Sequence, residues 1–340
     1  WVRLPAGGAE AYAEGKVQSA TGPSAITVNV GGASSVVSGD DLLHVNPDTV
    51  QPDLTNLMVL NEATMLDNVR QRFNAGKIYT RASTLLISLN PYRPLPELYN
   101  EAVRKKAKAA DLHNPELEPH IYHAAEKAYR ELAAAGKSQS LVISGESGAG
   151  KTEAMKICMN YLVWRSGAGG DTRMSRGGSQ NEELTMRIMQ SNPVLEALGN
   201  AKTRRNNNSS RFGKYINLLF DGNAAIVGAE MRTFLLEKSR VTNADAPNER
   251  SYHVFYQLVG SPHLPGKAPS DFRTLALSGC TTIPNVVDSE DFKKLQAALG
   301  WFGIENEMQA GLWQTAGAVL HLGNVLFTTS EEADDQAVLD

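Results

Sequence analysis

A glycine-rich octapeptide at residues 145–152 carries the strongest chemical signal in the sequence. It reads Gly-Glu-Ser-Gly-Ala-Gly-Lys-Thr and stands between an apolar run at residues 141–144 and a helical pattern at residues 153–164. Glycines let backbone N–H groups close around a phosphate, and the start of a helix adds the positive end of its dipole. Lys151 can reach the outer phosphates of a nucleotide, and the Thr152 hydroxyl can ligate Mg²⁺. The order of strand, glycine loop and helix predicts a phosphate-binding P-loop.

A polar stretch at residues 203–211 is the second candidate for phosphate chemistry. It reads Thr-Arg-Arg-Asn-Asn-Asn-Ser-Ser-Arg, and neither a helix nor a strand period fits it. A hydroxyl can complete a Mg²⁺ shell, amides can bond phosphate oxygens, and an arginine can offset phosphate charge or pair with a carboxylate. An ordinary polar surface loop explains the same composition equally well.

Asp221 resembles the aspartate that ends a strand in many nucleotide-binding proteins. However, it precedes Gly222 in a predicted turn between apolar runs at residues 215–220 and 224–229, and such a turn is a strong hairpin signal. We therefore interpret Asp221 as structural. The sequence contains neither D-x-x-G nor N-K-x-D, which argues against a GTPase.

The composition is that of an ordinary globular protein. Of 340 residues, 42% are hydrophobic and 21% are charged, and the formal net charge of −4 argues against a broad nucleic-acid-binding face. Two cysteines, Cys158 and Cys280, argue against a disulfide framework and fit a reducing compartment. No apolar run is long enough to predict a membrane span, and no signal peptide is visible. Because the chain starts at Trp1, we expect it to be an internal piece of a longer protein.

The elements that would position these motifs follow from local patterns. Residues 1–46 predict a small β-barrel or meander, and two prolines predict a linker over residues 47–60. A strand is predicted at residues 84–89, and a flexible loop at residues 166–180. The basic run at residues 104–108 is interpreted as a solvated helix face. Helices are predicted at residues 61–73, 95–110, 119–135, 153–164, 182–198, 249–259, 290–299 and 306–322.

Several motifs, in the same order, resemble the myosin motor head. Residues 145–152 look like its GESGAGKT loop. Residues 206–214, Asn-Asn-Asn-Ser-Ser-Arg-Phe-Gly-Lys, look like its switch I, and residues 90–93, Asn-Pro-Tyr-Arg, are similar to its purine-binding loop. Further similar stretches lie at residues 60–62, 78–80, 236–240 and 249–256. The resemblance extends over essentially the whole chain.

The resemblance implies an α/β fold. A P-loop NTPase core with a mixed β-sheet flanked by helices would follow a small SH3-like β-barrel at residues 1–46. Residues 47–340 would then be the N-terminal part of the motor domain, with the P-loop, loop 1 at residues 166–180, switch I and the start of the upper actin-binding subdomain.

The resemblance also implies roles for single residues. Lys151 would contact the β- and γ-phosphates, Ser209 would help to position the attacking water, and Arg211 would pair with a switch II glutamate. Thr152 and Ser210 would ligate Mg²⁺. The residues implied to contact the nucleotide are Gly145, Glu146, Ser147, Gly148, Ala149, Gly150, Lys151, Thr152 and Asn206 around the phosphates, and Asn90, Arg93 and Tyr99 on the adenine side.

The implied activity is Mg²⁺-dependent, actin-activated ATP hydrolysis that drives movement on actin filaments in the full-length protein. ATP and Mg²⁺ would be bound, light chains would bind a lever arm outside this sequence, and the location would be the cytoplasm and cytoskeleton. No nucleic-acid partner and no membrane span are expected.

Three departures from the family pattern stand out. Asn207 occupies a position where many members have Asp, and the loop at residues 94–99 is slightly longer than the common form. The switch II motif D-x-x-G-F-E is absent from the sequence. We therefore expect Arg211 to lack its partner here, and this piece alone to be incompetent in turnover.

Two alternatives remain open. An unrelated P-loop kinase or ATPase would need a Walker-B acid and a substrate pocket, and the sequence identifies neither. A truncated, non-motile half-head could bind nucleotide or partners without turnover. Measuring ATP turnover separately from ATP binding discriminates the motor from the half-head.

Overall fold

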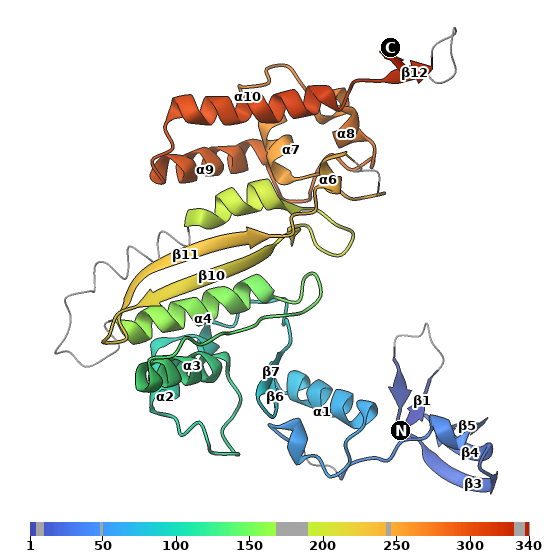
Figure 1. Ribbon diagram of the computed structural model, residues 1–340. Helices are drawn as coiled ribbons and strands as arrows, with labels where there is room; N and C mark the ends of the chain where they lie inside the picture. The colour runs from blue at the N-terminus through green and yellow to red at the C-terminus, as the bar shows by residue number, and fades with distance from the viewer. Residues whose placement is uncertain (5–9, 48–49, 168–189, 243–245, 330–336, 340) are drawn as a thin grey trace. The chain divides into compact units, whose positions relative to one another are not determined.

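The computed structural model describes residues 1–4, 10–47, 50–167, 190–242, 246–329 and 337–339 (Figure 1). The chain divides into two compact units. Unit 1 comprises Trp1–Ile143 and Ala149–Leu162, and unit 2 comprises Ser144–Gly148 and Val163–Asp340. The division passes through the glycine-rich loop at residues 145–152.

The strands of unit 1 form small antiparallel groups. β1 (Val2–Arg3) pairs with β2 (Tyr12–Ala13), and β3 (Lys16–Gly22), β4 (Ala25–Val30) and β5 (Ala33–Val37) form a three-stranded sheet. β6 (Tyr79–Ala82) and β7 (Leu85–Ser88) form a hairpin. The strand predicted at residues 84–89 is confirmed by β7, and β1 to β5 lie within residues 1–46, which were predicted to be rich in strands. The mainly polar residues of β3 are almost all exposed.

Two helices of unit 1 have an end at a residue that capping rules favour. α1 (Glu62–Asn74) has Asn61 as N-cap in a capping box with Thr64. α3 (Ile121–Ala135) ends at Gly136, whose φ of 63° is left-handed and suits glycine. α2 (Glu101–Ala109) and α4 (Lys151–Ser166) complete the set, and short 3₁₀ turns occur at η1 (Gly39–Asp41), η2 (Leu54–Asn56) and η3 (Pro96–Leu98).

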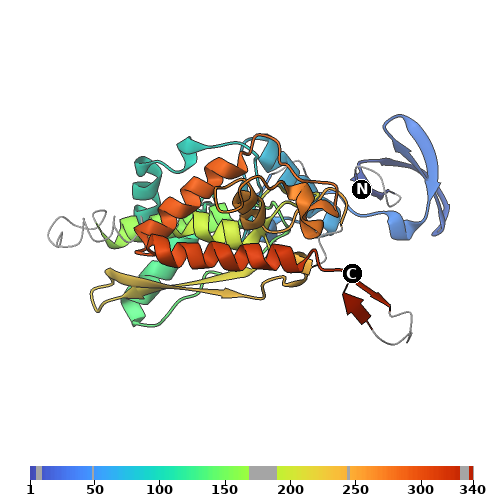
Figure 2. The same ribbon diagram turned by 90° about the horizontal axis from the view of Figure 1, so that it is seen from above.

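The predicted hairpin is the longest pair of strands in unit 2. β10 (Gly213–Phe220) and β11 (Ile226–Phe234) pair antiparallel as an extended two-stranded ribbon (Figures 1 and 2). In the turn, Asp221 Oδ1 accepts hydrogen bonds from the N–H groups of Asn223 and Ala225, both at 2.9 Å. The structural interpretation of Asp221 is thus confirmed, because its carboxylate is engaged by the turn.

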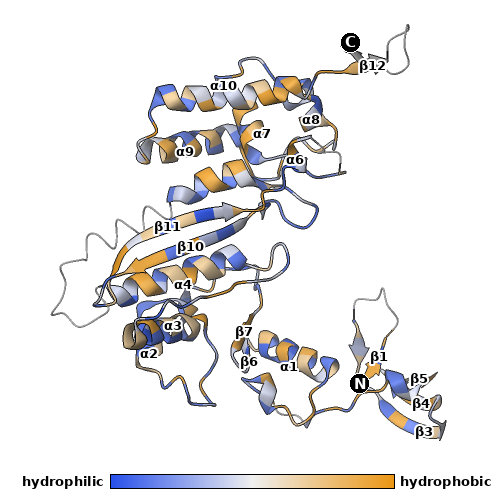
Figure 3. Ribbon diagram, in the orientation of Figure 1, coloured by the Kyte–Doolittle hydropathy of each residue, from blue (hydrophilic) through white to orange (hydrophobic). Residues whose placement is uncertain are grey.

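The core of unit 2 is helical. α7 (His253–Val259) is buried along its whole length and packs against α9 (Asp288–Trp301) and α10 (Asn306–Leu322). The rings of Phe292 and Trp313 join α9 to α10, with 4.8 Å between their centroids. Apolar and polar residues alternate along α9 and α10 in Figure 3, as expected for helices with one buried face. The remaining elements are α6 (Ser239–Thr242), α8 (Arg273–Ala276), η4 (Pro269–Asp271), β12 (Phe327–Thr329) and β13 (Ala337–Leu339).

Two expectations about the sheet were wrong for the described residues. The apolar run at residues 141–144 lies in a segment, residues 136–145, with neither helix nor strand, and Val142 is 90% exposed. Within the described ranges, every pair of strands is antiparallel, and the one parallel contact is an isolated bridge between Asp53 and Arg81. A β-strand forms only with a hydrogen-bonded neighbour, and the described residues supply none to this run.

Three predicted segments lie partly outside the residues that the structure describes. The flexible loop predicted at residues 166–180 lies outside the described residues from residue 168 onward, and only residues 190–198 of the helix predicted at residues 182–198 are described, where they are helical. Residues 48–49 of the predicted linker are likewise not described. Among the residues that are, no helix has both the length and the apolar character needed to cross a bilayer.

Candidate functional site

The glycine-rich loop has the backbone conformation that its sequence predicts. Gly148 and Gly150 have φ values of 83° and 94°, in the left-handed region that side chains other than glycine rarely adopt. α4 begins directly afterwards at Lys151, and the Ala154 N–H donates to the Gly150 carbonyl at 2.9 Å. The loop therefore places Lys151 and Thr152 in the first turn of α4, as expected.

The structure joins the two polar motifs at a pair of serines. The Ser147 and Ser209 hydroxyls lie 2.9 Å apart, within hydrogen-bond distance. Ser209 is buried, and it sits in β9 (Ser209–Ser210), which pairs with β8 (Asn200–Ala201). The short strand β9 was not predicted. Two of the predicted site residues, 62 positions apart in the sequence, are thus in direct contact.

Arg211 has a partner, contrary to the sequence analysis. Its Nε donates to Glu237 Oε2 at 2.5 Å, and its Nη1 donates to Ser209 Oγ at 3.2 Å. The expectation of an unpaired Arg211 was wrong because Glu237, 26 positions away, lies beside it in unit 2. The signal for Glu237 was its place in the Leu-Glu-Lys-Ser-Arg stretch at residues 236–240.

Glu237 belongs to a larger group of charges. Arg240 is 9% exposed, and its Nε also donates to Glu237 Oε2, at 2.8 Å. The Arg240 guanidinium bonds Glu249 Oε2 at 3.1 Å as well. Burial acts to raise the pKa of Glu237, but the hydrogen bonds and charges of Arg240 and Arg211 outweigh burial and leave the pKa lowered. The carboxylate is therefore ionised at neutral pH.

Asn206 and Asn208 shape the polar loop. Asn206 Oδ1 accepts from the Asn208 N–H at 2.9 Å, and the Asn206 N–H donates to Thr203 Oγ1 at 3.2 Å. The Asn208 amide is held by Asn200 Nδ2 at 2.8 Å and by the Glu196 carboxylate at 3.0 Å. These Asx-type bonds fix the loop without a helix or strand period, which explains why the sequence identified only a polar stretch.

His253 contacts the same loop and was not predicted. Its Nε2 lies 3.2 Å from Asn208 Oδ1. Burial, and then the charge of Arg250, lower the pKa of His253 to about 4, so the ring is neutral at pH 7. A neutral imidazole can donate one N–H to an amide oxygen, and this bond ties α7 to the loop.

Glu146 in the glycine loop forms an ion pair with Arg205 at 3.3 Å. Both side chains are largely exposed, so the pair contributes little to stability.

The predicted adenine-side residues lie in unit 1. Asn90 Oδ1 accepts from the Tyr92 N–H at 2.9 Å, which makes a local turn, and Arg93 is exposed. Tyr99 instead packs into an aromatic cluster. Its hydroxyl lies 2.8 Å from that of Tyr79, and its ring lies 5.9 Å from the ring of His120. Its role towards a base stays a prediction.

The two predicted Mg²⁺ ligands are neutral hydroxyls. Thr152 is in the first turn of α4, and Ser210 Oγ donates to the Phe212 carbonyl at 3.0 Å. Because the proton of Ser210 is engaged by that carbonyl, its oxygen retains lone pairs for a cation. Within the described residues, no cluster of three or more His, Cys, Asp or Glu side chains could hold a metal. The donor set fits an ion that takes most of its ligands from phosphate and water.

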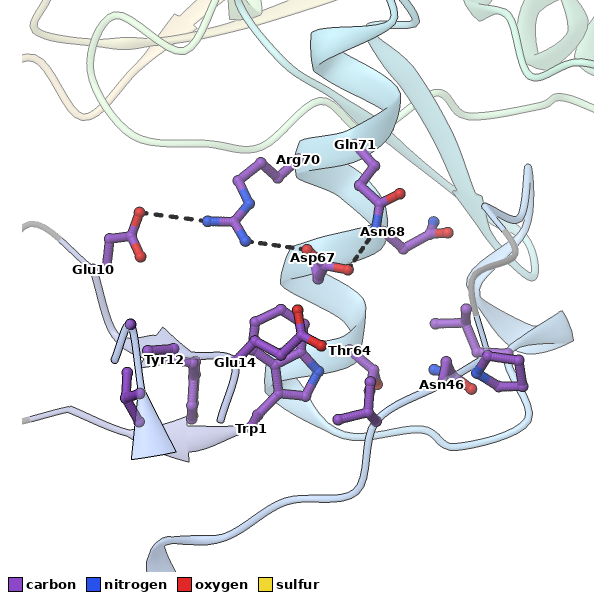
Figure 4. Close-up of a pocket in the computed structure, with 16 residues that line it drawn as sticks. Trp1, Glu10, Tyr12, Glu14, Asn46, Thr64, Asp67, Asn68, Arg70 and Gln71 are labelled. Atoms are coloured by element: carbon purple, nitrogen blue, oxygen red, sulfur yellow. Dashed lines mark hydrogen bonds and ion pairs between the residues drawn. The ribbon is translucent and has the colours of Figure 1, made fainter. Parts of the chain in front are cut away.

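A separate cavity of about 360 Å³ lies in unit 1 beside α1 (Figure 4). Arg70 projects from α1 and forms ion pairs with Glu10 and Asp67, at 3.5 Å and 3.1 Å. None of the predicted site residues lines this cavity.

Comparisons with known proteins agree with these motifs. The family model described as "Myosin head (motor domain)" matches residues 51–340. Among Arabidopsis thaliana proteins, the chain is 39% identical to Myosin-7 over 98% of its length and 39% identical to Myosin-13 over its full length. It is 42% identical to Myosin-14 over 85% of its length. The chain spans only about a fifth of these relatives, at 19%, 22% and 19% of their lengths.

Proposed function

Because the chain belongs to the myosin head family, we propose that it is the ATP-binding part of an actin-based motor. In the full-length protein, Mg²⁺-dependent hydrolysis of ATP would drive movement on actin filaments. The observation that carries the proposal is the contact between Ser147 in the glycine loop and Ser209 in the polar motif. Two stretches whose residue types suit phosphate binding meet there. A glycine turn that arose by chance would have no reason to contact the second stretch.

The proposed chemistry is an in-line attack of water on the γ-phosphate. Phosphoryl transfer needs positioning and charge stabilisation more than covalent help from the protein. Lys151 would neutralise the β- and γ-phosphates, backbone N–H groups of residues 145–150 would cradle them, and Asn206 would bond a phosphate oxygen. Ser209 would help to position the attacking water. Thr152 and Ser210 would hold Mg²⁺, which offsets phosphate charge when bound.

The remaining assignments also rest on the family. Residues 1–46 would form an SH3-like barrel, and residues 47–340 would form the N-terminal part of the motor domain. Asn90, Arg93 and Tyr99 would line the adenine side, and loop 1 at residues 166–180 would tune nucleotide release. Actin filaments would be the main partner, light chains would bind elsewhere in the full-length protein, and the protein would act at the cytoskeleton in the cytoplasm.

Substituting Lys151 tests the nucleotide site. Lys151→Ala is expected to abolish binding of a fluorescent ATP analogue, because it removes the cation that faces the outer phosphates. The matched control is Lys156→Ala in the same helix, where the ammonium pairs with Glu153 at 2.8 Å. The control should bind like the native protein. Unchanged affinity in Lys151→Ala would refute the assignment.

A further inference from the structure

We propose that Glu237 is a positioning residue for the phosphate site, acting through Arg211 on the Ser147–Ser209 pair. It would hold the Arg211 guanidinium against Ser209 and so set how the two hydroxyls face a terminal phosphate. This inference rests on the proposed function, because it takes the serine pair to lie at the γ-phosphate of ATP.

The backbone of Glu237 is fixed from two sides. Its N–H donates to the Arg211 carbonyl at 3.0 Å, and its own carbonyl accepts from the Tyr252 hydroxyl at 2.7 Å. Tyr252 is buried in the core of unit 2, at the start of α7. The main chain at Glu237 is thus bonded both to the polar motif and to the helical core. The position of its Cα, from which the side chain extends, is therefore fixed.

The carboxylate of Glu237 is fixed by Arg240. Arg240 binds the carboxylate in a bidentate manner, donating from Nε to Oε2 at 2.8 Å and from Nη2 to Oε1 at 3.2 Å. This pair of bonds sets both the position and the plane of the carboxylate. Arg240 is itself held by Glu249 and by the Arg250 carbonyl, at 3.1 Å and 3.2 Å. The acceptor offered to Arg211 therefore belongs to a rigid group.

The positive charges of Arg211 and Arg240 are matched in this group by the negative charges of Glu237 and Glu249. Arg240 can draw on both Glu237 and Glu249, whereas the ion pair of Arg211 is with Glu237. Removing the Glu237 charge would leave Arg240 with Glu249, whereas Arg211 would lose the ion pair that it forms among the described residues and keep its hydrogen bond to Ser209. An arginine that loses its ion pair recovers rotamer freedom and no longer holds one orientation. Removing the Glu237 charge is therefore expected to change the orientation of Arg211 more than that of Arg240.

Arg211 passes this orientation to the serines. Its Nη1 donates to Ser209 Oγ, so the hydroxyl of Ser209 is polarised by a cation and becomes a better donor towards Ser147. If Ser147 accepts that proton, its own O–H is left to donate to an anion. The chain from Glu237 to Ser147 thus favours hydroxyl donors facing a phosphate.

The test uses the complete native protein and the substitution Glu237→Gln. Affinities are measured for a fluorescent, non-hydrolysable ATP analogue and for the matching ADP analogue. We expect the affinity for the ATP analogue to fall about tenfold, as expected for the loss of a charged hydrogen bond, and the affinity for the ADP analogue to change less than about twofold. ADP lacks the γ-phosphate that the serine pair would contact.

The matched control is Glu230→Gln. Glu230 is an exposed glutamate of β11 that pairs with Arg232 at 3.4 Å, so the same charge is removed without disturbing Arg211. The control should leave both affinities unchanged. If Glu237→Gln does not fold, Glu237→Asp keeps the charge beside Arg240 but shortens the reach to Arg211, and it should show the same selective loss.

A double substitution separates positioning from a purely structural role. In an Arg211→Ala background, Glu237→Gln should cause no further loss of ATP affinity, although it should still lower thermal stability through Arg240. Equal losses for the ATP and ADP analogues, no loss for either, or additive losses in the double variant would overturn the proposal. Failure of the native protein to bind either nucleotide would instead overturn the proposed function, and this inference with it.

Discussion

At the scale of single residues, the surroundings of Glu237 and His253 determine whether these two contacts of the polar motif are charged or neutral. Glu237 stays ionised because two arginines outweigh the effect of its burial, and His253 stays neutral because it is buried beside Arg250. Asn208 joins the loop to His253, and through it to the core of unit 2. The position of the loop is therefore tied to a residue that lies outside the motif.

The neutral state of His253 predicts a pH dependence of stability. Its pKa is about 4 in the folded protein against an ordinary value of 6.5, so the unfolded chain binds the proton more tightly. The free energy of unfolding should therefore fall as the pH drops from about 6.5 towards 4, by about 1–2 kcal/mol at pH 5. His253→Gln should make the loss between pH 7.5 and pH 5 smaller, measured by urea unfolding.

His120, which burial and then His123 also shift to a pKa of about 4, should keep part of the slope in that variant. An unchanged slope in His253→Gln would contradict the argument.

At the scale of elements, buried polar residues decide how helices pack. The apolar positions Leu66 and Phe73 of α1 are exposed, whereas Asn68 and Arg72 are buried. The Asn68 amide bonds the backbone of Gln51, and Arg72 bonds Thr80 and the Tyr79 carbonyl. Helical periodicity correctly predicted this helix. However, its buried face is the one whose polar side chains form hydrogen bonds, not the one that carries Leu66 and Phe73.

Helices α3 and α4 are joined in unit 1 by a buried carboxylate. Glu126 is fully buried, and it accepts from the Tyr161 hydroxyl at 2.9 Å and from Arg130 Nε at 2.8 Å. Tyr161→Phe would remove one of these donors and is expected to destabilise the protein by about 1–3 kcal/mol. Tyr215→Phe on the exposed side of β10 is the control and should change stability by less than about 0.5 kcal/mol. Equal effects of the two substitutions in thermal unfolding would disprove a specific role for the Tyr161 hydroxyl.

At the scale of the whole molecule, the chain corresponds to about a fifth of its relatives and divides into two compact units. The motif D-x-x-G-F-E does not occur among these 340 residues. The apolar residues 141–143 are also exposed in this chain, before the glycine loop. Nucleotide binding and turnover by this chain are therefore separate proposals, and each needs its own measurement.

The 340-residue chain alone is expected to bind ATP weakly and to show negligible actin-activated turnover. Binding of a fluorescent ATP analogue and release of phosphate should be measured on the same preparation, with and without actin filaments. The Lys151→Ala variant supplies the baseline for both assays. Robust turnover by the isolated chain would show that the residues present are sufficient for catalysis.

The sequence by itself determined the features whose signals are local. The glycine loop, the cap of α1 at Asn61, the end of α3 at Gly136 and the turn at Asp221 each depend on residues a few positions apart. Helix α10 even has the predicted bounds, because its pattern is long and regular. The predicted residues Ser147 and Ser209 could be named from the sequence, but their contact could not.

The tertiary structure alone decided which distant groups meet. It paired Arg211 with Glu237, placed His253 against Asn208 and buried the polar side of α1. It also left residues 141–144 without strand partners in the part of the chain that the structure describes. Each of these outcomes depends on whether a partner far along the chain is within bonding distance. Periodicity and motif spacing carry no information about that distance, because chain folding sets it.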